Sequence, residues 1–116
     1  MSRLLGIARF RFHEGRVEEF KHLSRRCMEV VQESDTGTLR YDIFLNADES
    51  EALVIEEYAD TAALMEHLAN IGEDLSAAIM ATASVQGELL GDLSEELKEQ
   101  LQGGPVQSFA PFLSKG

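Results

Sequence analysis

The sequence predicts one α+β domain in which helices cover one face of an antiparallel sheet. The first observation is its length, because 116 residues suffice for one hydrophobic core and are too few for two. The second is that segments with the two-residue period of strands alternate with segments that have the 3.6-residue period of helices. The third is composition, since 44% hydrophobic and 27% charged residues are typical of a soluble globular protein.

The first strand is predicted at residues 4–12, because apolar residues there alternate with Arg9 and Arg11. A turn at residues 13–15 ends it. An amphipathic helix of about 18 residues, or roughly 27 Å, follows and continues to about residue 33. Its apolar residues recur at spacings of three and four, and they are Val17, Phe20, Leu23, Cys27, Val30 and Val31.

Two further strands are predicted at residues 38–46 and 52–58, joined as a hairpin by polar turn residues. The segment Ser34-Asp35-Thr36-Gly37 before them is typical of a helix end and a turn. Both strands carry large apolar residues on both faces, as Phe44 on the second strand and Val54 on the third indicate. The chain's own helices cover one sheet face, so we expect a second copy to cover the other in a homodimer.

Asp60 is the predicted N-cap of the second helix, which Gly72 interrupts before a second helical piece at residues 73–81. A fourth strand is predicted at residues 83–90, although Gly87 lies inside it. The order of elements is therefore β-α-β-β-α-β. This order is the split βαβ arrangement of a ferredoxin-like sandwich.

The chain is expected to divide into a ferredoxin-fold domain at residues 1–92 and a C-terminal segment at residues 93–116. This segment begins with a short helix, capped by Asp92 or Ser94, and ends in an apolar tail after Gly103-Gly104-Pro105. Terminal segments of this composition usually dock on a surface. We expect this one to lie on the domain or on the partner subunit, over the dimer surface or a pocket mouth.

The formal net charge of −11 excludes two classes of partner. Proteins that bind nucleic acids or anionic membranes usually carry more Lys and Arg than Asp and Glu, and this chain has the opposite balance. Residues 1–40 carry eight basic and six acidic side chains, whereas residues 41–116 carry two and fifteen. The asymmetry indicates either a solvated acidic face or a first third that steers an anionic or phenolic ligand.

The single cysteine, Cys27, predicts a reducing compartment, because it can form no internal disulfide and no cluster that binds zinc or iron–sulfur. Arg3, Arg9 and Arg11 interrupt the early apolar run, so neither a signal peptide nor a membrane span is predicted there. We therefore expect a cytoplasmic protein.

Three blocks of sequence carry a family resemblance. They are Arg9-Phe10-Arg11-Phe12-His13-Glu14-Gly15-Arg16 with Glu19-Phe20-Lys21, Asp35-Thr36-Gly37-Thr38-Leu39-Arg40-Tyr41-Asp42 running to Asn46, and His67-Leu68-Ala69-Asn70 after Glu56-Glu57-Tyr58. With these blocks the chain resembles the antibiotic biosynthesis monooxygenase (ABM) family over residues 3 to about 90. The C-terminal segment resembles that of a longer subgroup of the family.

The resemblance implies a dimeric α+β barrel made of two ferredoxin-like sheets, with a pocket between sheet and helices in each subunit. The best-known members oxidise phenols and quinols with O₂ and use no metal, haem or flavin. Haem-degrading relatives rely on a pocket Trp, an Asn in the first strand and a His on the second helix. The chain has no Trp and no Asn in residues 1–45, so haem degradation is set aside.

Oxygenation of a phenol without a cofactor needs a base that forms the phenolate and a donor that holds the developing anion. Histidine suits the base, and His13 and His22 are predicted at the surface. His67 shares one face of the second helix with Asn70, three residues later. It is either the base or a border residue of the core with its hydrogen bonds satisfied.

Tyr41 is either a donor to the phenolate oxygen or a core or interface aromatic residue. We take His67 as the base and Asn70 and Tyr41 as orienting donors, with no cofactor-binding residue and no metal ligand. The strand arginines, among them Arg40, are expected to form cross-strand ion pairs with Asp42, Glu56 or Glu88, or to clamp an anion.

The leading hypothesis is a cofactor-independent monooxygenase that oxidises a small aromatic hydroxyl compound with O₂. The alternative is a non-catalytic dimer of the same fold that binds a small ligand or is associated with stress. An isomerase or decarboxylase is a third possibility.

Overall fold

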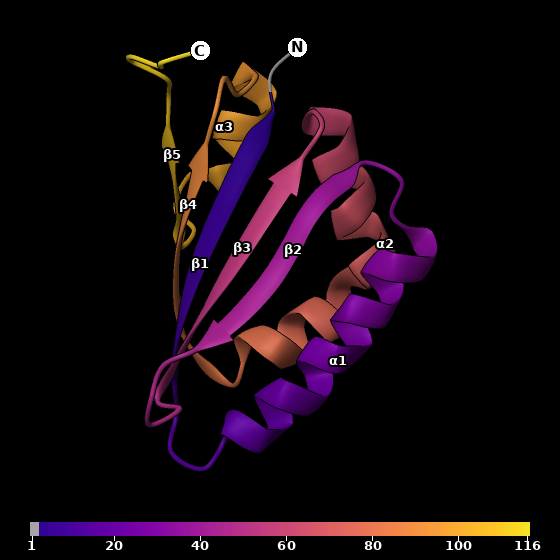
Figure 1. Ribbon diagram of the computed structural model, residues 1–116, viewed down its shortest axis with the longest axis vertical. Helices are drawn as coiled ribbons and strands as arrows, with labels where there is room; N and C mark the ends of the chain where they lie inside the picture. The colour runs from indigo at the N-terminus through magenta and orange to yellow at the C-terminus, as the bar shows by residue number, and fades with distance from the viewer. Residues whose placement is uncertain (1–2) are drawn as a thin grey trace.

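The computed structural model describes residues 3–116, which form a five-stranded sheet and three helices (Figure 1). The strand order is β2-β3-β1-β4-β5, with β5 parallel to β4 and the other neighbours antiparallel. The ferredoxin-like βαββαβ order predicted from the sequence is confirmed. The elements are β1 (Leu4–Phe12), α1 (Val17–Ser34), β2 (Thr38–Leu45), β3 (Glu51–Tyr58), α2 (Thr61–Met80), β4 (Ala83–Leu90), α3 (Glu95–Leu101) and β5 (Val106–Phe109).

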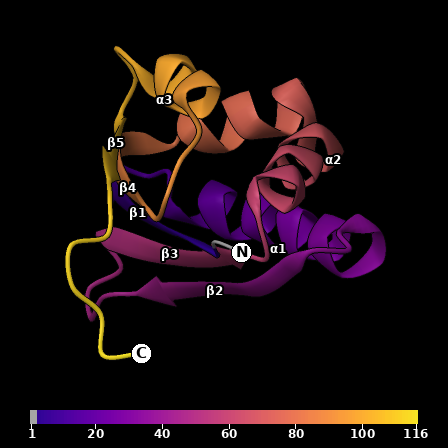
Figure 2. The ribbon, with the colours of Figure 1, turned by 90° about the horizontal axis from the view of Figure 1, so that it is seen from above.

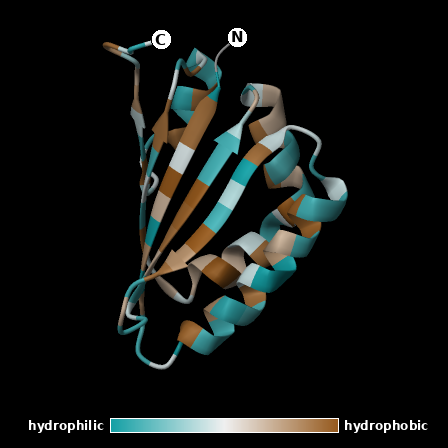
Figure 3. Ribbon diagram, viewed as in Figure 1, coloured by the Kyte–Doolittle hydropathy of each residue, from teal (hydrophilic) through white to brown (hydrophobic). Residues whose placement is uncertain are grey.

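Helices α1 and α2 lie on one side of the sheet, as the view in Figure 2 shows. Hydrophobic and hydrophilic bands follow one another along α1 (Figure 3). The buried residues of this helix are Phe20, Leu23, Ser24 and Cys27. Phe10 of β1 contacts Phe20 of α1 with ring centroids 5.1 Å apart. These contacts form the core between the two layers. Across residues 3–116, no helix combines the length and the apolar character that crossing a bilayer requires.

Helix α2 contains the break that the sequence predicts. Gly72 has φ 81°, a left-handed conformation that glycine adopts at little cost, and it separates two helical pieces. At the start of the helix the Asp60 side chain accepts a hydrogen bond from the backbone N–H of Ala63 at 2.8 Å, so the predicted N-cap is confirmed.

The C-terminal segment lies against its own chain in the structure. Ser94 caps α3, since its hydroxyl accepts from the backbone N–H of Leu97 at 3.2 Å. Leu93 and Leu97 are buried in one core cluster with Leu4 and Tyr58. Strand β5 pairs with β4 and was not predicted as a strand. The last residues of the tail are exposed, with Phe112 91% accessible.

The sheet face turned away from α1 and α2 carries both apolar groups and ion pairs. The register places Ile7 opposite Ile55 and Phe44 opposite Leu53 on this face, and Phe44 is 50% exposed. Arg40 pairs with Asp42 at 2.6 Å, but both residues lie on β2, so the predicted cross-strand pair is wrong. A strand arginine does form a cross-strand ion pair elsewhere, between Arg9 of β1 and Glu51 of β3 at 3.0 Å. Glu56 was also expected to pair with an arginine, which is wrong, because its side chain lies on the opposite face near Tyr58 and His67.

Candidate functional site

A cavity of about 310 Å³ lies between the sheet and helices α1 and α2. Its walls are mostly apolar, and it is partly open to solvent. The polar or sulfur-containing side chains that line it are Ser24, Cys27, Tyr41, Glu56, His67, Ser76 and Met80. A cavity of this size with a few convergent polar groups is typical of a small-molecule site.

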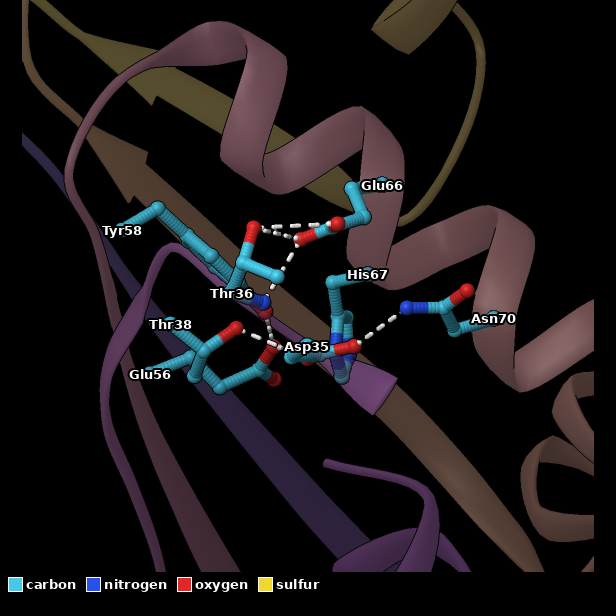
Figure 4. Close-up of polar contacts among 8 residues, drawn as sticks. All are labelled: Asp35, Thr36, Thr38, Glu56, Tyr58, Glu66, His67 and Asn70. Atoms are coloured by element: carbon cyan, nitrogen blue, oxygen red, sulfur yellow. Dashed lines mark hydrogen bonds and ion pairs between the residues drawn. The ribbon is translucent and has the colours of Figure 1, made fainter. Parts of the chain in front are cut away.

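His67 projects from α2 and is buried, with only 5% of its surface exposed. Its Nδ1 atom lies 2.7 Å from Oδ2 of Asp35, and its Nε2 atom lies 3.6 Å from Oε1 of Glu56. Figure 4 shows the imidazole between these two carboxyl groups. The structure therefore forms a chain of acid, imidazole and acid that ends at the cavity wall.

Asp35 is the fixed end of this chain. Its carboxylate accepts from Nδ2 of Asn70 at 2.8 Å and from the hydroxyl of Thr38 at 2.7 Å, in addition to its contact with His67. Burial alone would raise the pKa of Asp35, but these hydrogen bonds outweigh it and hold the pKa below its ordinary value. An ionised Asp35 keeps the proton of a neutral His67 on Nδ1 and leaves Nε2 free to accept one.

The segment that carries Asp35 is held firmly against α2. The backbone N–H of Thr36 donates to Glu66 at 2.8 Å, and its hydroxyl donates to the same carboxylate at 3.0 Å (Figure 4). Gly37 packs so closely that a Cβ atom added there would lie 2.4 Å from the Cβ atom of Ala63. The position of Asp35 is thus set by three successive contacts with the helix that carries His67.

Glu56 forms the other end of the chain. It projects from β3 into the space under the helices, where it accepts a hydrogen bond from the hydroxyl of Tyr58. Burial raises the pKa of Glu56, although the Tyr58 hydrogen bond and the nearby imidazole of His67 oppose this shift. Glu56 is therefore a carboxyl group suited to hold a proton next to Nε2 of His67.

Two tyrosine rings flank the imidazole. The ring centroids of Tyr41 and Tyr58 lie 5.5 Å and 5.4 Å from that of His67. Burial raises the pKa of both hydroxyls, so both remain protonated donors at neutral pH. Only Tyr41 lines the same cavity as His67.

The residues proposed from the sequence thus occupy two different places. His67 and Tyr41 line the cavity, whereas Asn70 lies behind the wall and donates to Asp35. The shared helix face of His67 and Asn70 is confirmed, because both side chains reach the same carboxylate. His13 and His22 are exposed, as expected.

Sequence reasoning assigned no role in the site to Asp35 or Glu56. Asp35 was explained as a turn residue, and only the folded chain brings it to His67, 32 positions later. Glu56 could have been found, because it shares its strand face with Ala52, Val54 and Tyr58, which places a carboxyl group among core residues.

A second apolar cavity of about 300 Å³ adjoins the first and lies against α3. Ala8, Glu56, Leu68, Gly87 and Val106 line both cavities, so the two share part of their walls. Pro105 and Val106 bring the C-terminal segment into the wall of the first cavity. Among residues 3–116, no three His, Cys, Asp or Glu side chains gather in a way that could hold a metal ion.

Comparison with known proteins gives a family match. The family described as antibiotic biosynthesis monooxygenase matches residues 4–72, which include Asp35, Glu56, His67 and Asn70. No curated protein matches the sequence significantly.

Several solved structures share the fold. MupZ from Pseudomonas fluorescens has a TM-score of 0.82 at 24% identity, over 98% of this chain and 93% of that protein. Rv0793 from Mycobacterium tuberculosis has a TM-score of 0.65 at 23% identity, over 80% and 97% of the two chains. SnoaB, a cofactor-independent oxygenase from Streptomyces nogalater, has a TM-score of 0.65 at 19% identity, over 80% and 93%.

Proposed function

Because the chain belongs to the antibiotic biosynthesis monooxygenase family, we propose that it is a monooxygenase that oxidises a small aromatic hydroxyl compound with O₂ and without a cofactor. One observation carries the proposal. The imidazole of His67 is held by the ionised Asp35 at Nδ1, its Nε2 lies 3.6 Å from Glu56, and both His67 and Glu56 line a mostly apolar cavity. This arrangement supplies a base in a site with little water, as formation and protection of a phenolate require.

In the proposed reaction, Nε2 of His67 accepts the proton of the substrate hydroxyl, and Asp35 stabilises the imidazolium that forms. The hydroxyl of Tyr41, also in the cavity wall, donates to the phenolate oxygen. The electron-rich phenolate passes one electron to O₂, and the resulting radical pair combines at a ring carbon that bears hydrogen. The peroxide anion so formed takes the proton back from Nε2 of His67 and becomes a hydroperoxide. Loss of water from this hydroperoxide gives a quinone, so one O₂ is consumed and one water is released per substrate.

Asn70 is a positioning residue in this scheme. Its amide does not reach the cavity and donates to Asp35 at 2.8 Å, which fixes the carboxylate that fixes His67. Glu56 lies 3.6 Å from Nε2 and, with a pKa raised by burial, is a carboxyl group that can exchange a proton with the imidazole. The apolar walls, which include Phe10, keep water from the radical pair.

We also propose that the active unit is a homodimer formed through the sheet face that carries Phe44 and Leu53. This face has apolar side chains that no helix of residues 3–116 covers, and family resemblance supports a second sheet as its cover. We also propose a cytoplasmic location, because the single cysteine, Cys27, is typical of a protein in a reducing compartment.

The function is tested by O₂ uptake with a panel of hydroquinones and naphthols. The wild-type protein is expected to consume O₂ with at least one of them, and His67→Ala is expected to lose most of this rate. His22→Ala is the matched control, because His22 is exposed on α1 and should retain full activity. Binding without O₂ uptake by the wild type would favour the alternative of a non-catalytic ligand-binding dimer, and full activity in His67→Ala would reject the assigned base.

A further inference from the structure

One buried polar group in the cavity wall has no partner. Ser24 lies on α1 and is 7% exposed, and its hydroxyl makes no hydrogen bond to any described residue. Serine in a helix commonly donates to the carbonyl oxygen of the preceding turn, which Ser24 does not do. A buried hydroxyl without a hydrogen-bond partner destabilises the folded state. Because Ser24 lines a cavity, a ligand bound there could supply the missing partner.

Ser24 occupies a different part of the cavity from the acid and imidazole chain. Cys27, three residues later on α1 and thus about 4.5 Å along the helix axis, packs against Tyr41. Ser24 and Ile43 also border a second groove that is nearer the start of α1. On β2, Ile43 is two residues from Tyr41, which places Ser24 toward the end of the cavity away from Tyr41.

We propose that the Ser24 hydroxyl binds a second oxygen atom of the substrate, at the end opposite the hydroxyl that meets His67. This inference rests on the proposed function for the position of the first oxygen. A serine hydroxyl both donates and accepts, so the second group is a hydroxyl or a carbonyl. An ionised group is disfavoured there, because the described residues that line the cavity include no Lys or Arg.

Among the phenols and quinols that the proposed function already covers, the Ser24 contact favours compounds with a second oxygen at the end of the molecule away from the reacting hydroxyl. Phe10, Ile43 and Val54 supply the apolar contacts along the cavity between the two polar ends. A compound with only one hydroxyl would leave Ser24 unpartnered and should bind more weakly.

The test measures binding without turnover, by titrating the protein in the absence of O₂ with two matched pairs of ligands. The pairs are phenol with hydroquinone and 1-naphthol with 1,5-dihydroxynaphthalene. In the wild type, the dihydroxy member of at least one pair should bind about three- to tenfold more tightly, which corresponds to one added hydrogen bond. In Ser24→Ala this preference should disappear, with the affinity for the monohydroxy member unchanged.

Two controls separate this role from a structural one. Ser84→Ala, in an exposed serine of β4 that does not line the cavity, should keep the preference. The thermal midpoint of ligand-free Ser24→Ala should equal or exceed that of the wild type, because the variant lacks the unpaired hydroxyl. A wild type without the preference, or a Ser24→Ala variant that retains it, would overturn the inference. Because the titration is carried out without O₂, its result does not depend on whether His67 catalyses the proposed reaction.

Discussion

The Nδ1 atom of His67 lies 2.7 Å from Oδ2 of Asp35, although the two residues are 32 positions apart in the sequence. Both side chains are almost completely buried. The contact joins the turn after α1 to the middle of α2, above the cavity floor formed by the sheet. It orients the imidazole so that Nε2 lies 3.6 Å from Oε1 of Glu56. His67 and Glu56 both line the cavity, as the base catalysis proposed above requires.

Replacing Asp35 by Asn should lower the turnover number strongly. The variant keeps the shape of the side chain but loses the charge that orients His67 and stabilises the imidazolium, so we expect kcat to fall on the order of 10²-fold or more. KM should change little, because Asp35 is not among the residues that line the cavity. Steady-state kinetics with an active substrate measures both quantities.

The matched control is Thr38→Val, which removes one donor from Asp35 and leaves the charge in place. This variant should retain most of the turnover number. If Asp35→Asn raised KM and left kcat unchanged, Asp35 would belong to substrate binding and would not act through His67.

Replacing Glu56 by Gln should stabilise the protein in a manner that depends on pH. Burial raises the pKa of Glu56 in the folded state, so above its ordinary value of 4.5 the unfolded chain releases the proton while the folded chain still holds it. The wild type therefore loses stability as pH rises through this window, and the Gln variant does not. The difference in the free energy of unfolding, from urea titrations at several pH values, should grow from about pH 4.5 upward.

Asp35→Asn should show the opposite sign in the same experiment. The pKa of Asp35 is lowered in the folded state, so its contribution to stability is complete above its ordinary value of 3.8 and is lost as pH falls through the folded pKa. The deficit of the variant should be largest at neutral pH and should shrink in acid. Parallel pH profiles for the two variants would be inconsistent with the assigned environments.

Replacing Gly37 by Ala should move the Asp35 segment away from α2. The added Cβ atom would lie 2.4 Å from the Cβ atom of Ala63, a distance that real atoms do not reach without displacement. We expect a loss of about 1–3 kcal/mol in the free energy of unfolding, as for other overpacked sites, together with a lower turnover number. Thermal or urea unfolding gives the first value.

The compensating change is Ala63→Gly, which removes the atom that the new methyl group would strike. The double variant should be more stable than the sum of the two single effects predicts, and it should recover part of the activity. Strict additivity would show that the close approach of Gly37 to Ala63 does not hold the segment in place.

A charge on the free sheet face should prevent the proposed dimer. Leu53→Glu places a carboxylate in the apolar part of this face, opposite Phe44, and should give a monomer at micromolar concentration in sedimentation velocity. Met65→Glu changes an exposed apolar residue on α2 and should leave the assembly unchanged. A wild-type protein that sediments as a stable monomer would contradict the proposed assembly.

The periodicity of the sequence was sufficient to predict the four main strands, both long helices and the break at Gly72, because each depends on local pattern or backbone conformation. Strand β5 escaped prediction, since four residues after a glycine-rich turn carry little periodic signal and their partner, β4, is distant in the sequence. His67 and Asn70 could be associated through helix geometry. Asp35 could not be associated with them from the sequence, because a turn after the first helix already accounted for an aspartate at this position.

The most direct test of the central claim follows the ionisation of a bound phenol. The probe is 4-nitrophenol, which has a visible absorbance band only as the phenolate, added at a pH below the pKa of the free compound. Wild-type protein should produce the phenolate band on binding, whereas His67→Ala should bind the probe in its neutral form. A probe that stays neutral in the wild type, or that ionises equally in His67→Ala, would contradict the assignment of His67 as the base.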